Sequence, residues 1–291
     1  MQLVPVDVHG ERYRAAPTRP AVSAARYSEP FPTALGVSTT DRISLLGQDL
    51  ADDIMGTVGF GELAFSLAAR RRPTPGETRL FEAVLAGLAD HGFTPTAIAA
   101  RLTYLSAPES VQGALAAGVL GAGSRFLGVT EDSARFLSAA LRAGEPTDDA
   151  GWDRLARETV QAERDRSRLI QVWVTTSTAT VTRGPGGSTP SPRRRASSGR
   201  TCACCSRSAR CTPRSLGRTL PLNGAGVSGA ALADLRLPAE LLRGFSVLAR
   251  TVGLIGQLAE ELAWPVGRSL HHALDVNSNA RPLTEPAAHE P

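Results

Sequence analysis

The chain has 291 residues, 42% of them hydrophobic, so it can bury one large core or one core with a smaller domain beside it. No apolar run is long enough to span a membrane, and residues 1–32 lack the apolar centre of a signal peptide, so we expect a cytoplasmic protein. The net charge of +4 is local: eight arginines and no acidic residue lie between positions 171 and 215, and removing those eight charges leaves −4 for the rest.

The first part of the chain gives little sign of regular structure. Residues 1–44 carry several prolines and small polar residues without helical periodicity, which predicts a loosely ordered arm with at most short extended pieces. From Gly47 the spacing of Leu50, Ile54 and Met55 becomes helical. Nothing in the chain alternates between polar and apolar residues as a half-buried strand would.

The remaining pattern predicts an all-α protein. Apolar residues are mostly Ala, Leu and Val, and Ala and Leu lose little on entering a helix. Thr94 and Thr130 are expected to be N-caps. Helical periodicity is present, in chain order, over residues 60–70, 78–90, 94–105, 110–120, 131–142, 151–168 and 239–262.

Few residues outside the basic segment carry chemistry. His91 ends a helix in an Ala-Asp-His-Gly run, where a histidine more often caps the helix than catalyses. Arg250 lies within an apolar helix, where a charge is usually paired or points out, but a buried arginine also holds a carboxylate bidentately. The glycines of residues 118–123 lack the strand and the Lys-Ser/Thr pair of a phosphate loop, and close helix packing explains them.

Several blocks, taken in order, resemble one superfamily. They are residues 47–55 (GQDLADDIM), 60–65 (FGELAF), 73–77 (PTPGE), 89–101 (ADHGFTPTAIAAR), 110–128 (SVQGALAAGVLGAGSRFLG), 218–223 (RTLPLN) and 245–255 (FSVLARTVGLI). Together they look like the citrate synthase superfamily, most closely citryl-CoA lyase and the lyase domain of ATP-citrate lyase. The resemblance covers about residues 45–170 and 217–268.

The resemblance implies a citrate synthase-like fold with a large and a small helical domain, and usually a homodimer. It implies an enzyme that interconverts acetyl-CoA and oxaloacetate with citryl-CoA or citrate, with a coenzyme A thioester as substrate and no metal. His91 matches the family histidine that helps to form the acetyl-CoA enol, which is hydrogen-bonding and proton-transfer chemistry suited to an imidazole. Arg250 matches an arginine that binds a substrate carboxylate, and Asn223 lies in a substrate-binding block.

Two departures from the family pattern bear on activity. Ala225 stands about where citrate synthases carry the aspartate that removes the alpha proton. The family motif Pro-Gly-x-Gly-His, whose histidine polarises the oxaloacetate carbonyl, is also missing after the helix that ends near Leu169. The chain instead continues from Gln171 into a Thr-, Gly-, Ser-, Pro- and Arg-rich stretch.

We hypothesise that residues 171–217 are translated out of frame. Joining the third base of each codon to the first two of the next can yield P-G-V-G-H at the expected place, with unassigned third bases chosen freely. Tryptophan has a single codon, so the second glycine, formed by Trp173 and Val174, is forced. The usual frame resumes near Leu216, so two compensating insertions or deletions suffice. We expect residues 171–215 to be irregular and the chain to be impaired as an enzyme.

Other interpretations of this segment remain open but are disfavoured. Its cysteines lack paired C-x2-C spacing and a nearby histidine, which argues against zinc; they are Cys202, Cys204, Cys205 and Cys211. The Arg-rich run is also typical of a nucleic-acid-binding segment. The functional alternatives are therefore a non-catalytic paralogue that binds CoA or a partner subunit, and an Arg-rich nucleic-acid-binding protein.

The predicted organisation follows from these blocks. It comprises an arm (1–44), the N-terminal part of a large helical domain (45–170), the aberrant segment (171–217), a C-terminal helical part (218–270) and a tail (271–291). His271 and His272 are expected to be surface residues at the start of that tail.

Overall fold

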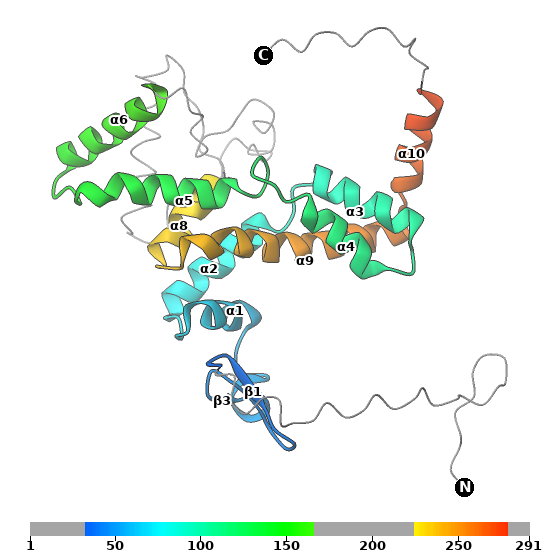
Figure 1. Cartoon of the computed structure of the whole chain (residues 1–291), viewed down its shortest axis with the longest axis horizontal. Coiled ribbons are helices and arrows are strands. Elements are labelled where there is room, and N and C mark those ends of the chain that lie inside the picture. The colour runs from blue at the N-terminus through cyan, green and yellow to red at the C-terminus, as the bar shows by residue number, and fades with distance from the viewer. Residues whose placement is uncertain (1–32, 166–223, 279–291) are drawn as a thin grey trace, which may run out of the picture. The chain divides into compact units, whose positions relative to one another are not determined.

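The computed structural model describes residues 33–165 and 224–278. The predicted irregular segment, its four cysteines and Asn223 lie outside these ranges, and the predicted domain boundaries stay predictions. The chain divides into two compact units, Met1–Met55 and Gly56–Pro291. The described residues are mostly helical, so the predicted all-α class is confirmed (Figure 1).

The described part of the first unit is a small antiparallel sheet. Strand β1 (Gly36–Ser38) pairs with β2 (Ile43–Leu45), and β2 pairs with β3 (Gln48–Asp49). Leu46 and Gly47 have φ angles of 53° and 77°, as in a two-residue hairpin turn. The helical spacing noted from Gly47 onward corresponds to a single π-helical turn, Leu50–Ile54, which follows β3 directly.

The second unit begins with α1 (Phe60–Ala69), α2 (Pro75–Leu88), α3 (Pro95–Ser106) and α4 (Val111–Leu120). It continues with α5 (Val129–Ala140), a 3-10 turn (Leu141–Ala143) and α6 (Asp149–Asp165). The described residues from 224 onward contain α8 (Gly224–Asp234), a 3-10 turn (Ala239–Leu241), α9 (Leu242–Ala263) and α10 (Gly267–Val276). These helices share one core with the helices that end at residue 165, since α5 packs against α8 and α3 against α9.

Helix caps and turns explain where the predicted boundaries hold or fail. Thr94 caps α3 as predicted, because its side chain accepts a hydrogen bond from the Ala97 N–H. Thr130 is not a cap: it is buried inside the first turn of α5, whose N-cap is Gly128. His271 and His272, predicted to begin a tail, lie on α10 and are exposed.

The core consists of packed clusters connected by α9. One cluster contains Phe65, Phe81 and Phe245, whose rings meet edge to face at centroid distances of 5.6 and 5.1 Å. A second contains alanines of α3 and α4 with Leu254 and Leu258 of α9. Helix α9 supplies residues to both clusters and runs along the centre of the helices in Figure 1. This central helix also carries several of the site residues described below.

A capping box fixes the start of α2. Thr74 Oγ1 accepts a hydrogen bond from the Glu77 N–H, and Glu77 Oε2 accepts one from the Thr74 N–H at 2.8 Å. Arg71 Nη2 donates to Glu77 Oε1 at 2.6 Å. The Arg71 hydrogen bond lowers the pKa of Glu77 from 4.5 to about 2, against the opposing effect of burial, and the Thr74 contacts add to this lowering.

We expect Glu77→Gln to lower the free energy of unfolding at pH 7 by about 1 kcal/mol, because glutamine can still accept from the Thr74 N–H but loses the charge that pairs with Arg71. A carboxylate with a depressed pKa stabilises the fold above pH 4.5, and this stabilisation is lost as the pH falls toward 2. Urea unfolding at pH 7 and pH 3 should therefore show a smaller difference between variant and parent at the lower pH. Glu109→Gln, at an exposed position, is the control.

Candidate functional site

A buried polar stripe runs along one face of α9. Arg250, Gln257 and Glu261 are 6%, 9% and 6% exposed, and Leu254 lies between them on the same face. Their spacing of three to four residues places them on successive turns. Buried polar side chains need partners, and this stripe is the largest set of them on any described helix.

The turn between α2 and α3 lies directly on this face. Gly92 has a φ of 69°, and its N–H donates to Asp90 Oδ2 at 2.8 Å. A Cβ added at Gly253 would lie 2.7 Å from the Ala89 carbonyl carbon and closer still to its oxygen. Glycine at position 253 therefore lets the backbone of the turn rest on the backbone of α9.

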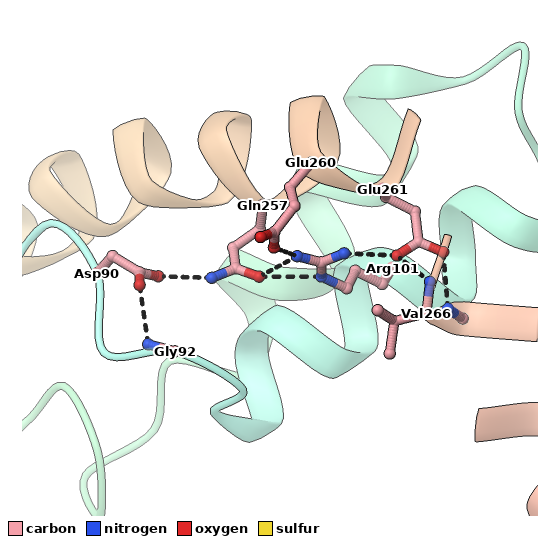
Figure 2. Close-up of polar contacts among 8 residues, drawn as sticks. Asp90, Gly92, Arg101, Gln257, Glu260, Glu261 and Val266 are labelled. Carbon is pink, nitrogen blue, oxygen red and sulfur yellow. Dashed lines mark hydrogen bonds and ion pairs between the residues drawn. The ribbon is translucent and has the colours of Figure 1, made fainter. Parts of the chain in front are cut away.

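Arg101 of α3 completes the arrangement (Figure 2). Its side chain is fully buried, and Nε and Nη2 donate to Gln257 Oε1 at 2.9 and 2.7 Å. Nη1 donates to Glu261 Oε2 at 2.6 Å, and Nη2 also pairs with the half-exposed Glu260. Gln257 Nε2 donates in turn to Asp90 Oδ1 at 2.9 Å. We call this set the Arg101 network: Asp90, Arg101, Gln257, Glu260 and Glu261.

The network also fixes the start of α10. Glu261 accepts hydrogen bonds from the Val266 and Gly267 N–H groups at 3.0 and 2.7 Å. Burial alone would raise the pKa of Glu261, but its hydrogen bonds with Arg101 and with these two N–H groups hold that pKa below its usual value. A carboxylate at a helix N-terminus also interacts favourably with the helix dipole.

Arg250 and Asp90 interact electrostatically. Burial would raise the pKa of Asp90, but the Gly92 N–H, the Gln257 amide and the charge of Arg250 together lower it. Burial lowers the pKa of Arg250, and Asp90 opposes that shift. Nε and Nη1 of Arg250 are buried and have no hydrogen-bond partner among the described residues. Within the ranges that the structure describes, Arg250 is therefore a buried cation with two donor groups that no acceptor meets.

The structure places the predicted site residues as follows. His91 is exposed on the turn, and its Nδ1 lies 2.6 Å from the Asp90 carbonyl oxygen. Arg250 is buried on α9, and its charge acts on Asp90, the residue directly before His91 in the chain. Asn223 precedes α8 and lies outside the described residues. Ala225 lies within α8.

Arg101 and Gln257 were not predicted as site residues from the sequence. Arg101 is the last residue of the block 89–101. It lies one turn after Ala97 on the apolar face of α3, and this spacing could have predicted that it is buried. Its partner Gln257 could not be assigned, because nothing in either local pattern connects positions 156 residues apart.

Neither a metal site nor a membrane span is found in the ranges that the structure describes. No group of three His, Cys, Asp or Glu residues there could hold an ion. No helix of those ranges is both long and apolar enough to cross a membrane.

Comparison with known proteins gives the fold. No protein-family model and no curated protein sequence matches the chain. Citryl-CoA lyase from Hydrogenobacter thermophilus superposes with a TM-score of 0.70 and 24% identity, over 89% of this chain and 98% of that one.

ATP citrate lyases give further matches at a TM-score of 0.65 and 19% identity. The Methanothrix soehngenii structure, in complex with citrate and coenzyme A, covers 100% of this chain and 45% of its own. A Methanosaeta concilii variant in complex with (3S)-citryl-CoA covers 97% and 47%. The chain spans under half of these two enzymes and nearly all of the first. It therefore has the fold of citryl-CoA lyase, which is citrate synthase-like.

Proposed function

We propose that the chain is a citryl-CoA lyase or citrate synthase type protein whose catalytic machinery is incomplete as the sequence stands. The observation that carries the proposal is Arg250, a buried guanidinium beside the His91 turn whose Nε and Nη1 have no partner in the described part of the chain. A guanidinium binds a carboxylate through two parallel N–H donors. Citrate and its CoA thioester offer such carboxylates, and solved proteins of this fold bind them.

The proposed reaction breaks one carbon–carbon bond. The hydroxyl group of citryl-CoA loses its proton, the bond between the hydroxyl carbon and the thioester methylene breaks, and oxaloacetate forms. The electron pair passes to the acetyl-CoA enol or enolate, which takes a proton on carbon. The reverse direction joins the same two products.

The described residues support two roles in this reaction. A carbonyl oxygen only accepts, so the contact with Asp90 requires a proton on His91 Nδ1 and leaves Nε2 for the substrate. We assign His91 to stabilising the enol of acetyl-CoA by accepting a hydrogen bond from the enol O–H at Nε2, and Arg250 to holding a carboxylate. The oxaloacetate-binding histidine expected from the family motif is missing from the sequence, which supports the proposed loss of activity.

The test compares three proteins in a citryl-CoA cleavage assay that follows oxaloacetate. The chain as written should show no turnover, and the chain with residues 171–217 restored to the other frame should release acetyl-CoA and oxaloacetate. His91→Ala in the restored chain should lower kcat by about 10²-fold, as loss of one catalytic hydrogen-bonding group usually does.

Each possible result tests a different part of the proposal. Turnover by the chain as written would disprove the impairment. An inactive but folded restored chain that also fails to bind CoA thioesters would disprove the enzyme assignment. Binding of a CoA thioester without turnover by the chain as written would favour the non-catalytic paralogue. Salt-dependent RNA binding lost on deleting residues 171–215 would favour the nucleic-acid alternative.

The proposal also includes a homodimer, as the sequence resemblance implies, and the cytoplasmic location expected from the sequence. Sedimentation equilibrium of the restored chain tests the dimer: a single species of about one chain mass would contradict it.

A further inference from the structure

Gln257 connects a buried cation to a carboxylate. Its Oε1 accepts from Arg101, and its Nε2 donates to Asp90. An arginine can only donate and an ionised aspartate can only accept, so the orientation of this amide is fixed by chemistry. Among side chains of this length only glutamine can accept at one end and donate at the other.

The donor end of Gln257 acts on the His91 turn. Asp90 uses one carboxylate oxygen for Gln257 and the other for the Gly92 N–H, so its side chain crosses the turn. Its backbone carbonyl oxygen faces His91 Nδ1. Holding the Asp90 side chain therefore also holds the carbonyl group that sets the protonated nitrogen of the imidazole.

The acceptor end of Gln257 contacts Arg101, a side chain that has several partners of its own. Arg101 is fully buried and is also held by Glu261. Its guanidinium lies 5.1 Å from the ring centroid of Phe93, which is part of the same turn. The turn is thus held at Asp90 by the amide and at Phe93 by the guanidinium.

We propose that Gln257 is a positioning residue for His91. Through Asp90 it fixes the turn so that the neutral imidazole carries its proton on Nδ1 and presents Nε2. The positioning is a property of the described residues, and its catalytic importance rests on the function proposed above.

The first test uses the unaltered chain. 15N NMR of the neutral His91 ring should show the Nδ1–H tautomer as the main form, whereas free histidine favours Nε2–H. A main Nε2–H form would overturn the proposal without any variant.

The second test separates the two ends of the amide. Gln257→Glu keeps oxygen acceptors for Arg101 but cannot donate to Asp90 at pH 8. We expect amide exchange at Gly92 to become about tenfold faster, the effect of one lost hydrogen bond, and the His91 tautomers to mix. Exchange at Gly113, whose N–H donates to Ser110 Oγ, should not change. Gln112→Glu, at an exposed position, is the matched control.

A reversed pair provides the rescue. In the double variant Asp90→Asn/Gln257→Glu, the new asparagine can donate to the glutamate and still accept from the Gly92 N–H. Slow Gly92 exchange and the Nδ1–H tautomer should both return. The proposal is wrong if Gln257→Glu leaves both signals unchanged, or if the double variant, once folded, behaves like the single one.

The catalytic consequence is measured in the restored chain. Gln257→Glu should lower kcat about tenfold with little change in KM, because it mispositions a reacting group without removing a substrate contact. If the restored chain has no activity, the proposed function fails while the NMR results still decide the positioning role. If it is active and Gln257→Glu leaves kcat unchanged, the catalytic importance of the positioning is disproved.

Discussion

Replacing Arg101 by methionine is expected to lower the free energy of unfolding by about 3–5 kcal/mol, the usual cost of removing one partner of a buried ion pair. Methionine fills similar space, so the effect reports charge and hydrogen bonding more than volume. The variant leaves the Glu261 carboxylate, which is 4% exposed, without its cation and Gln257 Oε1 without donors. Because the free energy of unfolding of a whole protein is usually about 5–15 kcal/mol, a loss of this size leaves the variant only marginally folded.

Urea unfolding followed by circular dichroism measures this loss. The control is Arg135→Met, because Arg135 is 45% exposed and pairs with Glu131 one helical turn away at 3.0 Å. That change should cost less than about 1 kcal/mol, as exposed ion pairs usually do. Equal, small losses for the two variants would show that the Arg101 network contributes little to stability.

Gly253→Ala is expected to lower the free energy of unfolding by about 3 kcal/mol, which is at the upper end of the losses seen for overpacked sites. The clash is with backbone atoms of Ala89, which cannot move aside as a flexible side chain would. The variant must therefore separate α9 from the turn that bears His91. In the restored chain it should also lower catalytic activity, because the turn and Arg250 would no longer face each other as they do here.

Gly256→Ala provides a matched comparison three residues along the same helix. A Cβ at Gly256 would meet no atom within 4 Å. Alanine is a better helix former than glycine, so this variant should raise the free energy of unfolding by about 0.5–1 kcal/mol. Opposite signs for the two substitutions in thermal unfolding would confirm that position 253 is a contact between backbones. A gain at both positions would contradict it.

The helices were predictable because their signals are local. Thr94 followed by Pro95 marks the start of α3, and the structure confirms it. The start of α2 was placed too late, at residue 78, although Thr74, Pro75 and Glu77 together form a capping-box pattern. The strands β1–β3 have only two or three residues each, too few for an alternating pattern to appear.

Helix α8 was not predicted because its sequence obscures the usual periodicity. Three glycines fall within Gly224–Asp234, and nearly every other residue is small, so polar and apolar faces cannot be told apart. Its burial against α5 makes it helical, and that contact joins parts of the chain on opposite sides of the undescribed segment. Such a long-range effect is not visible in a local window.

The candidate site was predictable in part. His91 and Arg250 came from a family resemblance, and Arg250 is buried with two donors that have no partner among the described residues. The network that connects their surroundings depends on which faces of α3 and α9 meet, and pairs Arg101 with residues 156 to 160 positions later. Side-chain pairing over that distance follows from the packed fold rather than from spacing.

This distance between Arg101 and its partners has a consequence for protein synthesis. The ribosome makes α3 well before α9, so the nascent chain holds an arginine that cannot be buried until Gln257 and Glu261 emerge. A single uncorrected shift of reading frame near residue 171 would remove both partners, and proteases would clear the unfolded product. A second, compensating shift keeps them. If residues 171–217 are out of frame, as we hypothesise, the chain keeps both partners of Arg101, and we expect it to fold without the family motif.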